Sequence, residues 1–381
     1  MVAGFIQVLP PFQPATLGGT PRPAPFLQWP DGMRSSRCYQ ALVGQHAGWQ
    51  RDTMAGLNRR TFLQSSAGAT LAGLAAGQNP PIPVIDTHIH LFDVSRPQGI
   101  PWPPKDNAVL YRTALPERYR KLAAPFGVVG AIEVEASPWL EDNQWVLDIA
   151  AKDKILVGTV GDIEPGTPDF RKNLERFHHN PLFRGIRYGN LWERDSGGSK
   201  HTDDLDKAIG RREFVEDLKA LAAADLELDS ANPTPALIHA LVRTSDAVPN
   251  LRIVIDHLAK LEIPTDAAVK KSYYADLREL GKRPQVFVKI SSVLRRVDGR
   301  VPEDLGFYRG LLDELWGVFG EDRVLYGSDW PNSDTLAGYP QVFRIVREYF
   351  SSKPRAAQEK YFWRNSRAAY KWVKRDGSQP G

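Results

Sequence analysis

The segment VIDTHIH at residues 84–90 carries side chains whose types and spacing suit metal or acid–base chemistry. Residues two apart on a strand share a face, so we expect Asp86, His88 and His90 to point one way and the two isoleucines the other. We place the polar set in a barrel interior, because the outer face must pack on helices. Burying these groups costs several kcal/mol unless they pair or bind a metal, and imidazoles at this spacing can reach one ion. The alternative is two core histidines with hydrogen-bond partners.

A second segment, VVGAIEVE at 128–135, repeats this alternation with carboxylates. By the same argument, Ile132 and Val134 are expected to face outward, and Glu133 and Glu135 inward. Glu135 lies nearer the end of the strand, where it could bind a metal or orient a water molecule. The alternative for both glutamates is an interior carboxylate held in a salt bridge.

Two cations occupy comparable positions near the ends of later strands. Arg187 and Lys289 are each expected to face the interior. An inward guanidinium near a barrel mouth needs an anionic or hydroxylated partner, and its planar fork suits a carboxylate or an oxyanion. Both residues are therefore candidates for substrate binding. For Arg187 the alternative is a structural ion pair with Glu133 or Asp162.

A histidine and an aspartate end two further strands. His257 is placed on one face with Ile253 and Ile255, which indicates an inward-facing group at the catalytic end. Asp329 closes the last strand, and Trp330 follows where the chain turns out, as a further candidate for substrate contact. The alternatives are a structural histidine bonded to a loop and an aspartate that caps a helix.

These residues need a scaffold that brings many strand ends to one mouth. Strands are predicted near 84–90, 128–135, 155–163, 183–189, 226–231, 251–258, 286–293 and 323–330. Helical periodicity between them predicts helices at 141–152, 168–178, 211–224, 234–247, 268–281 and 303–319. This alternation predicts a single-domain α/β fold, the parallel (β/α)8 TIM barrel. A doubly wound open sheet is the alternative, but it more often has a glycine-rich turn after its first strand.

The chain before the barrel has a different character. Residues 1–53 are proline-rich and are predicted to be disordered or an over-extended reading frame, with Met54 as the true start. Residues 54–79 combine Arg59-Arg60 with an apolar stretch of small residues and resemble a twin-arginine export signal; an amphipathic helix is the alternative. The stretch is short for a bilayer span. We therefore expect export to the periplasm without a stable membrane anchor, or a cytoplasmic protein if the signal is not used.

Charge and cysteine content exclude some classes of function. Residues 1–79 hold six Lys/Arg and two Asp/Glu, which leaves 43 basic and 43 acidic residues in the remainder of the chain. Of this remainder, 80–375 is assigned to the barrel and 376–381 to a tail. A basic footprint for nucleic acid is therefore absent. The single cysteine, Cys38, lies ahead of the signal, so the mature protein would have neither disulfides nor Cys-ligated zinc.

Five motifs on five strand ends resemble the amidohydrolase superfamily, and the stretch 84–375 is similar to its amidohydrolase 2 branch. That branch includes sugar lactonases, the pyrone dicarboxylate lactonase, and related hydrolases and decarboxylases. The motifs are Asp86-Thr87-His88-Ile89-His90, the run from Val134 to Asn143, Phe183-Arg184-Gly185-Ile186-Arg187, Val254-Ile255-Asp256-His257 and Tyr326-Gly327-Ser328-Asp329-Trp330-Pro331. One His-x-His pair is a weak signal, but five motifs in order are specific.

The resemblance implies one divalent ion, zinc in the first place, and roles for the strand-end residues. The expected ligands are His88, His90, His257, Asp329 and Glu135. His257 could instead polarise the substrate. Asp329 would take a proton from the attacking water and deliver it to the leaving group, and Arg187 would balance developing negative charge.

The metal count follows from a departure from the wider superfamily. Members with two metals also use a lysine or glutamate after strand four and a histidine after strand five. Here strand four offers Arg187, and strand five ends in LDSA without a histidine. One divalent ion, or metal-independent chemistry, is therefore expected.

Hydrolysis of a carboxylated or hydroxylated lactone is the leading hypothesis, with that small molecule as the partner. A non-oxidative decarboxylase on the same barrel is one alternative, in which Arg187 would bind the substrate carboxylate. An exported binding protein without catalysis is the other. Retention of both histidines with His257 and Asp329 argues against that last class, because a binder needs no proton shuttle. The substrate and the oligomeric state are not predicted.

Overall fold

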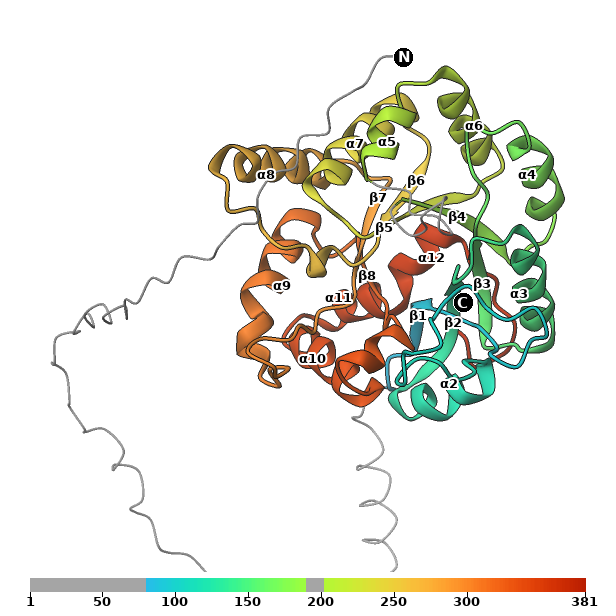
Figure 1. Cartoon of the computed structure of the whole chain (residues 1–381). Helices are drawn as coiled ribbons and strands as arrows, with labels where there is room; N and C mark the ends of the chain where they lie inside the picture. Colours follow the sequence, from blue (N-terminus) through green and yellow to red (C-terminus); the bar gives the residue numbers. More distant parts are fainter. Residues whose placement is uncertain (1–79, 190–201) are drawn as a thin grey trace, which may run out of the picture. The chain divides into compact units, whose positions relative to one another are not determined.

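An eight-stranded parallel sheet forms the centre of the computed structural model, which describes residues 80–189 and 202–381 (Figure 1). The strands are β1 (Val84–Ile89), β2 (Val128–Val134), β3 (Leu156–Gly161), β4 (Phe183–Gly189), β5 (Glu227–Ala231), β6 (Arg252–Ile255), β7 (Val286–Ile290) and β8 (Val324–Tyr326). They follow one another around the sheet in chain order. A parallel bridge between Ile89 and Trp330 joins the two ends of the sheet. The predicted TIM barrel is confirmed.

Helices surround the barrel (Figure 1). They are α2 (Pro116–Ala123), α3 (Leu140–Lys152), α4 (Phe170–His178), α5 (Thr202–Ala208), α6 (Arg212–Ala223), α7 (Pro235–Ala247), α8 (Ala267–Gly281), α9 (Leu305–Phe319), α10 (Tyr339–Ser351), α11 (Arg355–Glu359) and α12 (Asn365–Tyr370). Local sequence sets their starts: the Thr234 side chain caps α7, and Asp266 accepts from the first amides of α8. The six predicted helices are present, and α2, α5 and α10 to α12 lie where no helix was predicted.

Apolar side chains cover both faces of the barrel strands. Inside, Ile85, Ile132, Val134, Val254 and Leu325 form one cluster with residues of the C-terminal segment. Outside, the strands contribute to a separate, larger cluster with the helices. Strands buried on both faces carry no alternation that marks the interior, so polarity alone does not identify the inward face.

Two predictions of side-chain direction are wrong for this reason. Asp86 turns away from the interior and accepts hydrogen bonds from the hydroxyls of Tyr119 and Tyr339, which lie on α2 and α10. The pairing of β1 with β2 is irregular between Asp86 and Ile89, and this breaks the expected alternation. On β2, Ile132 and Val134 are inside, while Glu133 borders a cavity shared with residues of α3.

The C-terminal segment covers the base of the barrel. Tyr370, at the end of α12, donates a hydrogen bond from its hydroxyl to Asp229 on β5 at 2.8 Å. Trp372 packs in the interior cluster, and Gln379 donates to the carbonyls of Val129 and Lys154. Residues 376–381, set apart above as a tail, are therefore attached to the barrel base.

None of the described helices combines the length and the apolar character that crossing a membrane requires. The predicted signal at 54–79 and the segment 1–53 lie outside the described residues.

Candidate active site

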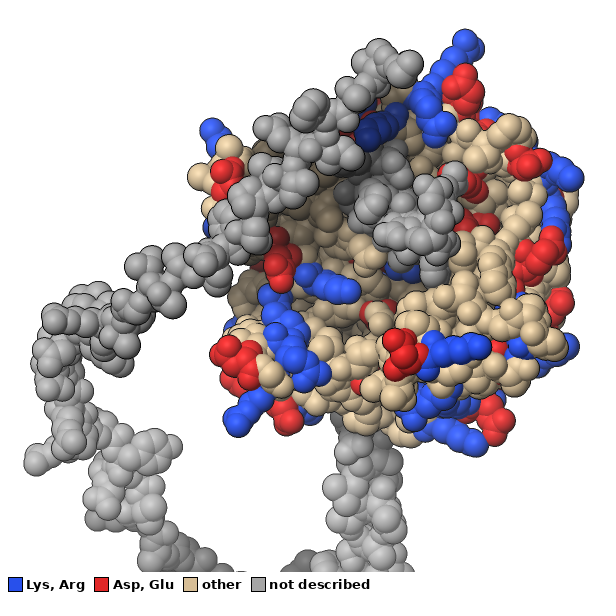
Figure 2. Space-filling model, in the orientation of Figure 1, with Lys and Arg blue, Asp and Glu red and all other residues tan. Residues whose placement is uncertain are grey.

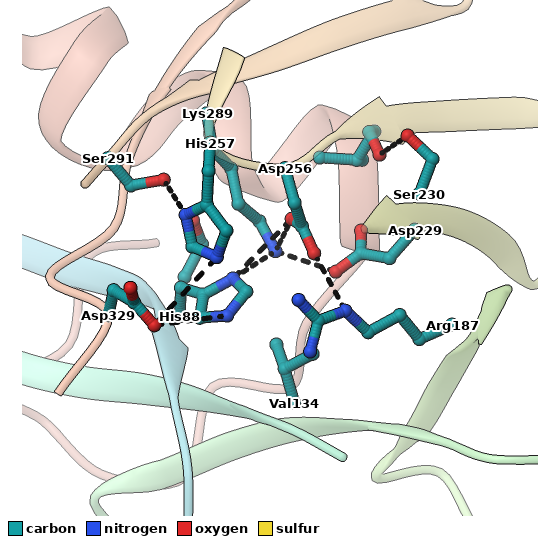
Figure 3. Close-up of polar contacts among 12 residues, drawn as sticks. His88, Val134, Arg187, Asp229, Ser230, Asp256, His257, Lys289, Ser291 and Asp329 are labelled. Atoms are coloured by element: carbon teal, nitrogen blue, oxygen red, sulfur yellow. Dashed lines mark hydrogen bonds and ion pairs between the residues drawn. The ribbon is translucent and has the colours of Figure 1, made fainter. Parts of the chain in front are cut away.

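Three imidazoles meet one carboxylate oxygen at the carboxyl ends of β1, β6 and β8. Figure 3 shows two of them, His88 and His257, beside Asp329. The Oδ1 atom of Asp329 lies 3.3 Å from Nε2 of His90 and 3.8 Å from Nε2 of both His88 and His257. The Nε2 atoms of His88 and His90 are 3.3 Å apart. Four predicted site residues are thus brought together, and all four are buried.

This arrangement fits a single divalent ion. Asp329 Oδ1 has no hydrogen-bond partner among the described residues, so a buried carboxylate oxygen faces the imidazoles unsatisfied. His90 Nδ1 lies 2.8 Å from the Val134 carbonyl, which can only accept; Nδ1 therefore carries the proton and Nε2 is free to bind a metal. Zinc–nitrogen bonds of about 2.0–2.1 Å in a tetrahedron separate neighbouring ligand atoms by roughly 3.3–3.4 Å. The contacts of His90 with His88 and Asp329 match this separation, and ligand atoms of His88, His257 and Asp329 lie within 4.8 Å of one another.

The protonation states of these residues also suit a divalent ion. Burial lowers the pKa of His257 to about 4, and burial lowers that of His88 well below its usual value, so both rings are neutral near pH 7. Burial opposes ionisation of Asp329, but the imidazoles of His257, His90 and His88 outweigh it and lower its pKa. A carboxylate and neutral imidazoles are the forms that bind a divalent cation.

The backbone that presents two of these groups is strained. His257 has φ of 53° and Asp329 has φ of 59°, in the left-handed region that non-glycine residues avoid. A second bond network holds Asp329: its Oδ2 accepts from the Ser292 hydroxyl and the Asn332 amide. His257 Nδ1 lies 2.7 Å from Ser291 Oγ. Residues kept in such conformations cost about 1–3 kcal/mol each and cluster at functional sites.

Beneath the imidazoles lies a buried group of charged residues. Lys289 Nζ lies 2.6 Å from Asp229 Oδ2, 2.8 Å from Asp256 Oδ1 and 3.1 Å from His88 Nδ1. Arg187 Nε lies 3.0 Å from Asp256 Oδ2. Burial raises the pKa of Asp256, but Lys289, His88 and Arg187 together hold it well below its usual value. The Lys289 ammonium thus occupies the position between His88, Asp229 and Asp256 that a second cation would take.

A cavity at the barrel mouth opens onto the imidazoles. Its lining includes His90, Arg187, His257, Asp329 and Glu135. Its volume is roughly 230 Å³, slightly below the usual range of drug-sized sites and sufficient for a small ligand. Glu135 is buried and borders this cavity, so it reaches the mouth as predicted.

Two predicted substrate contacts lie elsewhere. Lys289 is fully buried below His88, and Trp330 is fully buried against the ring of Tyr119 and the guanidinium of Arg118. Among the described residues, neither belongs to the cavity lining. Arg187 does line the cavity, but its ion-pair partner is Asp256 and not Glu133 or Asp162.

Sequence reasoning gave no role to Asp256 or Asp229. Asp256 is part of the recognised IDH motif, and it shares the inward face of β6 with Val254, two residues before it. The face was assigned instead to Ile253 and Ile255, which pack outward. Asp229 on β5 was noted only because no histidine stands there. The sequence did contain a signal for Asp256, because side chains two residues apart on a strand share a face and Val254 faces inward.

Comparison with known proteins shows the family of this chain. Residues 85–372 match the model of the Amidohydro_2 family, described as amidohydrolase. The chain belongs to the amidohydrolase family. The chain is 32% identical over 260 residues to L-fucono-1,5-lactonase of Burkholderia ambifaria, covering 67% of this chain and 82% of the relative. It is 26% identical over 262 residues to 4-sulfomuconolactone hydrolase of Rhizobium radiobacter, covering 65% and 75%.

Solved structures share the barrel of this amidohydrolase. An amidohydrolase from Burkholderia multivorans, solved with bound Zn, superimposes with a TM-score of 0.65 at 22% identity over 76% of this chain and 99% of that one. A putative 2-pyrone-4,6-dicarboxylic acid hydrolase from Pseudomonas putida gives a TM-score of 0.58 at 18% identity over 76% and 98%. At these identities the likeness concerns the fold.

Proposed function

We propose that this amidohydrolase opens a lactone ring by hydrolysis at the His88, His90, His257 and Asp329 cluster. The observation that carries the proposal is the meeting of three Nε2 atoms with the unsatisfied Oδ1 of Asp329 at the floor of a cavity that His90, His257 and Asp329 line. The similarity to a fuconolactonase and a sulfomuconolactone hydrolase supports a cyclic ester as the substrate class.

The four clustered residues would hold one divalent ion, with zinc as the proposed metal. When bound, such an ion polarises a carbonyl and acidifies water. Glu135, which borders the cavity, is retained as a further ligand or water-orienting group. His88 is oriented for this role from behind, because its Nδ1 lies 3.4 Å from Asp256 Oδ1, which can accept the Nδ1 proton and leave Nε2 free for the ion.

Asp329 serves as base and then as acid. Its ionised carboxylate takes a proton from water as the water oxygen bonds to the lactone carbonyl carbon. The ring carbon–oxygen bond then breaks, and Asp329 returns the proton to the departing ring oxygen, which gives a hydroxy acid. Arg187, at the cavity wall, is positioned to balance the negative charge on the carbonyl oxygen.

A lactone panel tests the proposal. The full chain, loaded with zinc, is incubated with L-fucono-1,5-lactone and other sugar lactones while released acid is titrated and CO2 is measured. Acid release without CO2 is expected. CO2 release from a carboxylic acid without lactone opening would contradict lactone hydrolysis and identify the decarboxylase alternative, and binding without turnover would identify a binding protein.

We also propose export through the segment 54–79, on the strength of Arg59-Arg60 and the apolar stretch that follows. Fractionation of cells that express the full chain is expected to place it in the periplasm. The double change Arg59→Lys and Arg60→Lys is expected to retain it in the cytoplasm. Equal distribution of both forms would contradict the proposal.

A further inference from the structure

A groove continues from the active-site cavity along the loop that follows β7. The two spaces share Lys260, Asp329 and Asn332 in their walls, and the groove adds Ser292, Arg295 and Arg296. It holds roughly 1090 Å³ of free space, including open solvent. Figure 2 shows a hollow near the centre of the described surface, with Lys and Arg side chains along its lower left edge. A substrate at Asp329 can therefore extend into this groove.

Three cations in the groove have no acidic partner among the residues that the structure describes. Arg295 donates to the Ala259 carbonyl at 3.2 Å, and Arg296 donates to the carbonyls of Gly299 and Thr335 at 3.1 Å. No ion pair joins these arginines or Lys260 to a carboxylate within the described part of the chain. Bonds to backbone carbonyls orient a guanidinium but leave its charge uncompensated, so the groove carries positive charge available to a ligand.

The acidic residues of the groove do not cancel this charge. Asp329 faces three imidazoles and is committed to the catalytic cluster. Glu262 is the other carboxylate in the lining, and it is exposed to solvent, as are Lys260 and Arg296. Arg295 is half-buried, where water screens its charge less. Three cations against one carboxylate outside the catalytic cluster leave a net positive charge, which concentrates ligands of the opposite sign.

We propose that Lys260, Arg295 and Arg296 bind an anionic substituent of the substrate, so that the preferred lactones carry a carboxylate or a comparable anion. The inference rests on the proposed lactone hydrolysis. With the ester carbonyl at Asp329, the anion lies on the side of β7 and β8, beyond Asn332. The planar fork of arginine matches carboxylate geometry, which favours this partner over a neutral hydroxyl group.

Two pairs of probes that differ by one charge test the inference. The first pair is 5-oxotetrahydrofuran-2-carboxylate and its carboxamide, compared by kcat/KM for the zinc-loaded full chain. The second is cyclopentanecarboxylate and cyclopentanecarboxamide, which have no ester bond, compared by NMR binding titration. The carboxylate is expected to be favoured at least tenfold in both pairs, and added salt is expected to reduce the preference.

Variants assign the preference to the groove. Arg295→Gln and Arg296→Gln are expected to lower the carboxylate-to-amide ratio about tenfold, whereas Lys270→Gln, an equal charge change at an exposed position of α8, leaves it unchanged. A preference that survives in both arginine variants would belong to the metal and would overturn the inference. Equal binding of the cyclopentane pair would overturn it as well. If the cyclopentane preference holds but no lactone is opened, the anion site stands and the proposed hydrolysis fails.

Discussion

The ammonium of Lys289 lies 2.8 Å from Oδ1 of Asp256, and both side chains are completely buried beneath the histidines. Burial lowers the pKa of Lys289, but Asp229 and Asp256 outweigh it and raise the pKa above the usual value. The pair is therefore ionised, and it places a buried positive and a buried negative charge directly beneath the histidines.

Replacing Lys289 by methionine is expected to destabilise the fold by about 3–5 kcal/mol, because Asp229 and Asp256 would keep a buried charge without its partner. Urea unfolding of the full chain measures the loss. Lys270→Met, at an exposed position, is the control and should change the free energy of unfolding by less than about 0.5 kcal/mol. Similar stabilities for the two variants would show that the buried pair contributes nothing.

Asp329→Asn is expected to lower kcat for lactone hydrolysis by about 10²–10⁴, because an amide cannot accept the proton of the attacking water. Titration of released acid measures the rate. Asp106→Asn, which removes one exposed carboxylate, provides the matched control. Unchanged turnover in Asp329→Asn would exclude the base assigned here.

Metal content should depend on the imidazoles. Elemental analysis of the purified full chain is expected to give about one divalent ion per molecule, and His90→Ala should lower the retained fraction after dialysis at least tenfold. His239→Ala, on the exposed surface of α7, should retain the wild-type content. Equal metal in the His90 variant would place the ion elsewhere, and full activity after exhaustive chelation would favour the metal-independent alternative.

Acid is expected to destabilise the metal-free protein through His257. Burial lowers its folded pKa to about 4, below the value near 6.5 expected in the unfolded chain. The unfolded state therefore binds the proton first, so this contribution is present above pH 6.5 and is lost as the pH falls toward 4. It amounts to about 3 kcal/mol at most. In EDTA across this range, the free energy of unfolding should vary less steeply with pH for His257→Gln than for the wild type. An unchanged pH dependence in His257→Gln would contradict the role given to this histidine.

The sequence predicted the barrel well, because segments with strand periodicity alternate regularly with segments of helical periodicity. Each element could be recognised from the pattern of polar and apolar residues within its own segment. All eight strands appear within a few residues of their predicted limits, although β6, β7 and β8 end three or four residues sooner. Their last residues leave strand geometry to aim His257 and Asp329, both with positive φ, into the cavity. Such turns depend on tertiary contacts that the local sequence does not encode. The alternating pattern therefore continues through them, and the predicted strands are too long at this end.

The sequence predicted well which residues gather at the site. It predicted poorly in which direction their side chains point and which residues they contact. His88, His90, His257 and Asp329 meet, as the strand-end motifs indicated. The orientation of Asp86 depends on the irregular pairing of β1 and on two tyrosines far along the chain. The burial of Lys289 depends on Asp229 and Asp256 from other strands. These are long-range contacts that a local alternation of polar and apolar residues does not encode.

The hydroxyl of Tyr370 reaches Asp229, whose carboxylate holds Lys289 under His88. The first and last parts of the barrel thus meet at one point, through His88 near its start and Tyr370 near its end. During synthesis on a ribosome, the histidine pair emerges about 280 residues before the tyrosine that completes its support. A growing chain consequently cannot assemble the finished charge network until the segment around Tyr370 has been made.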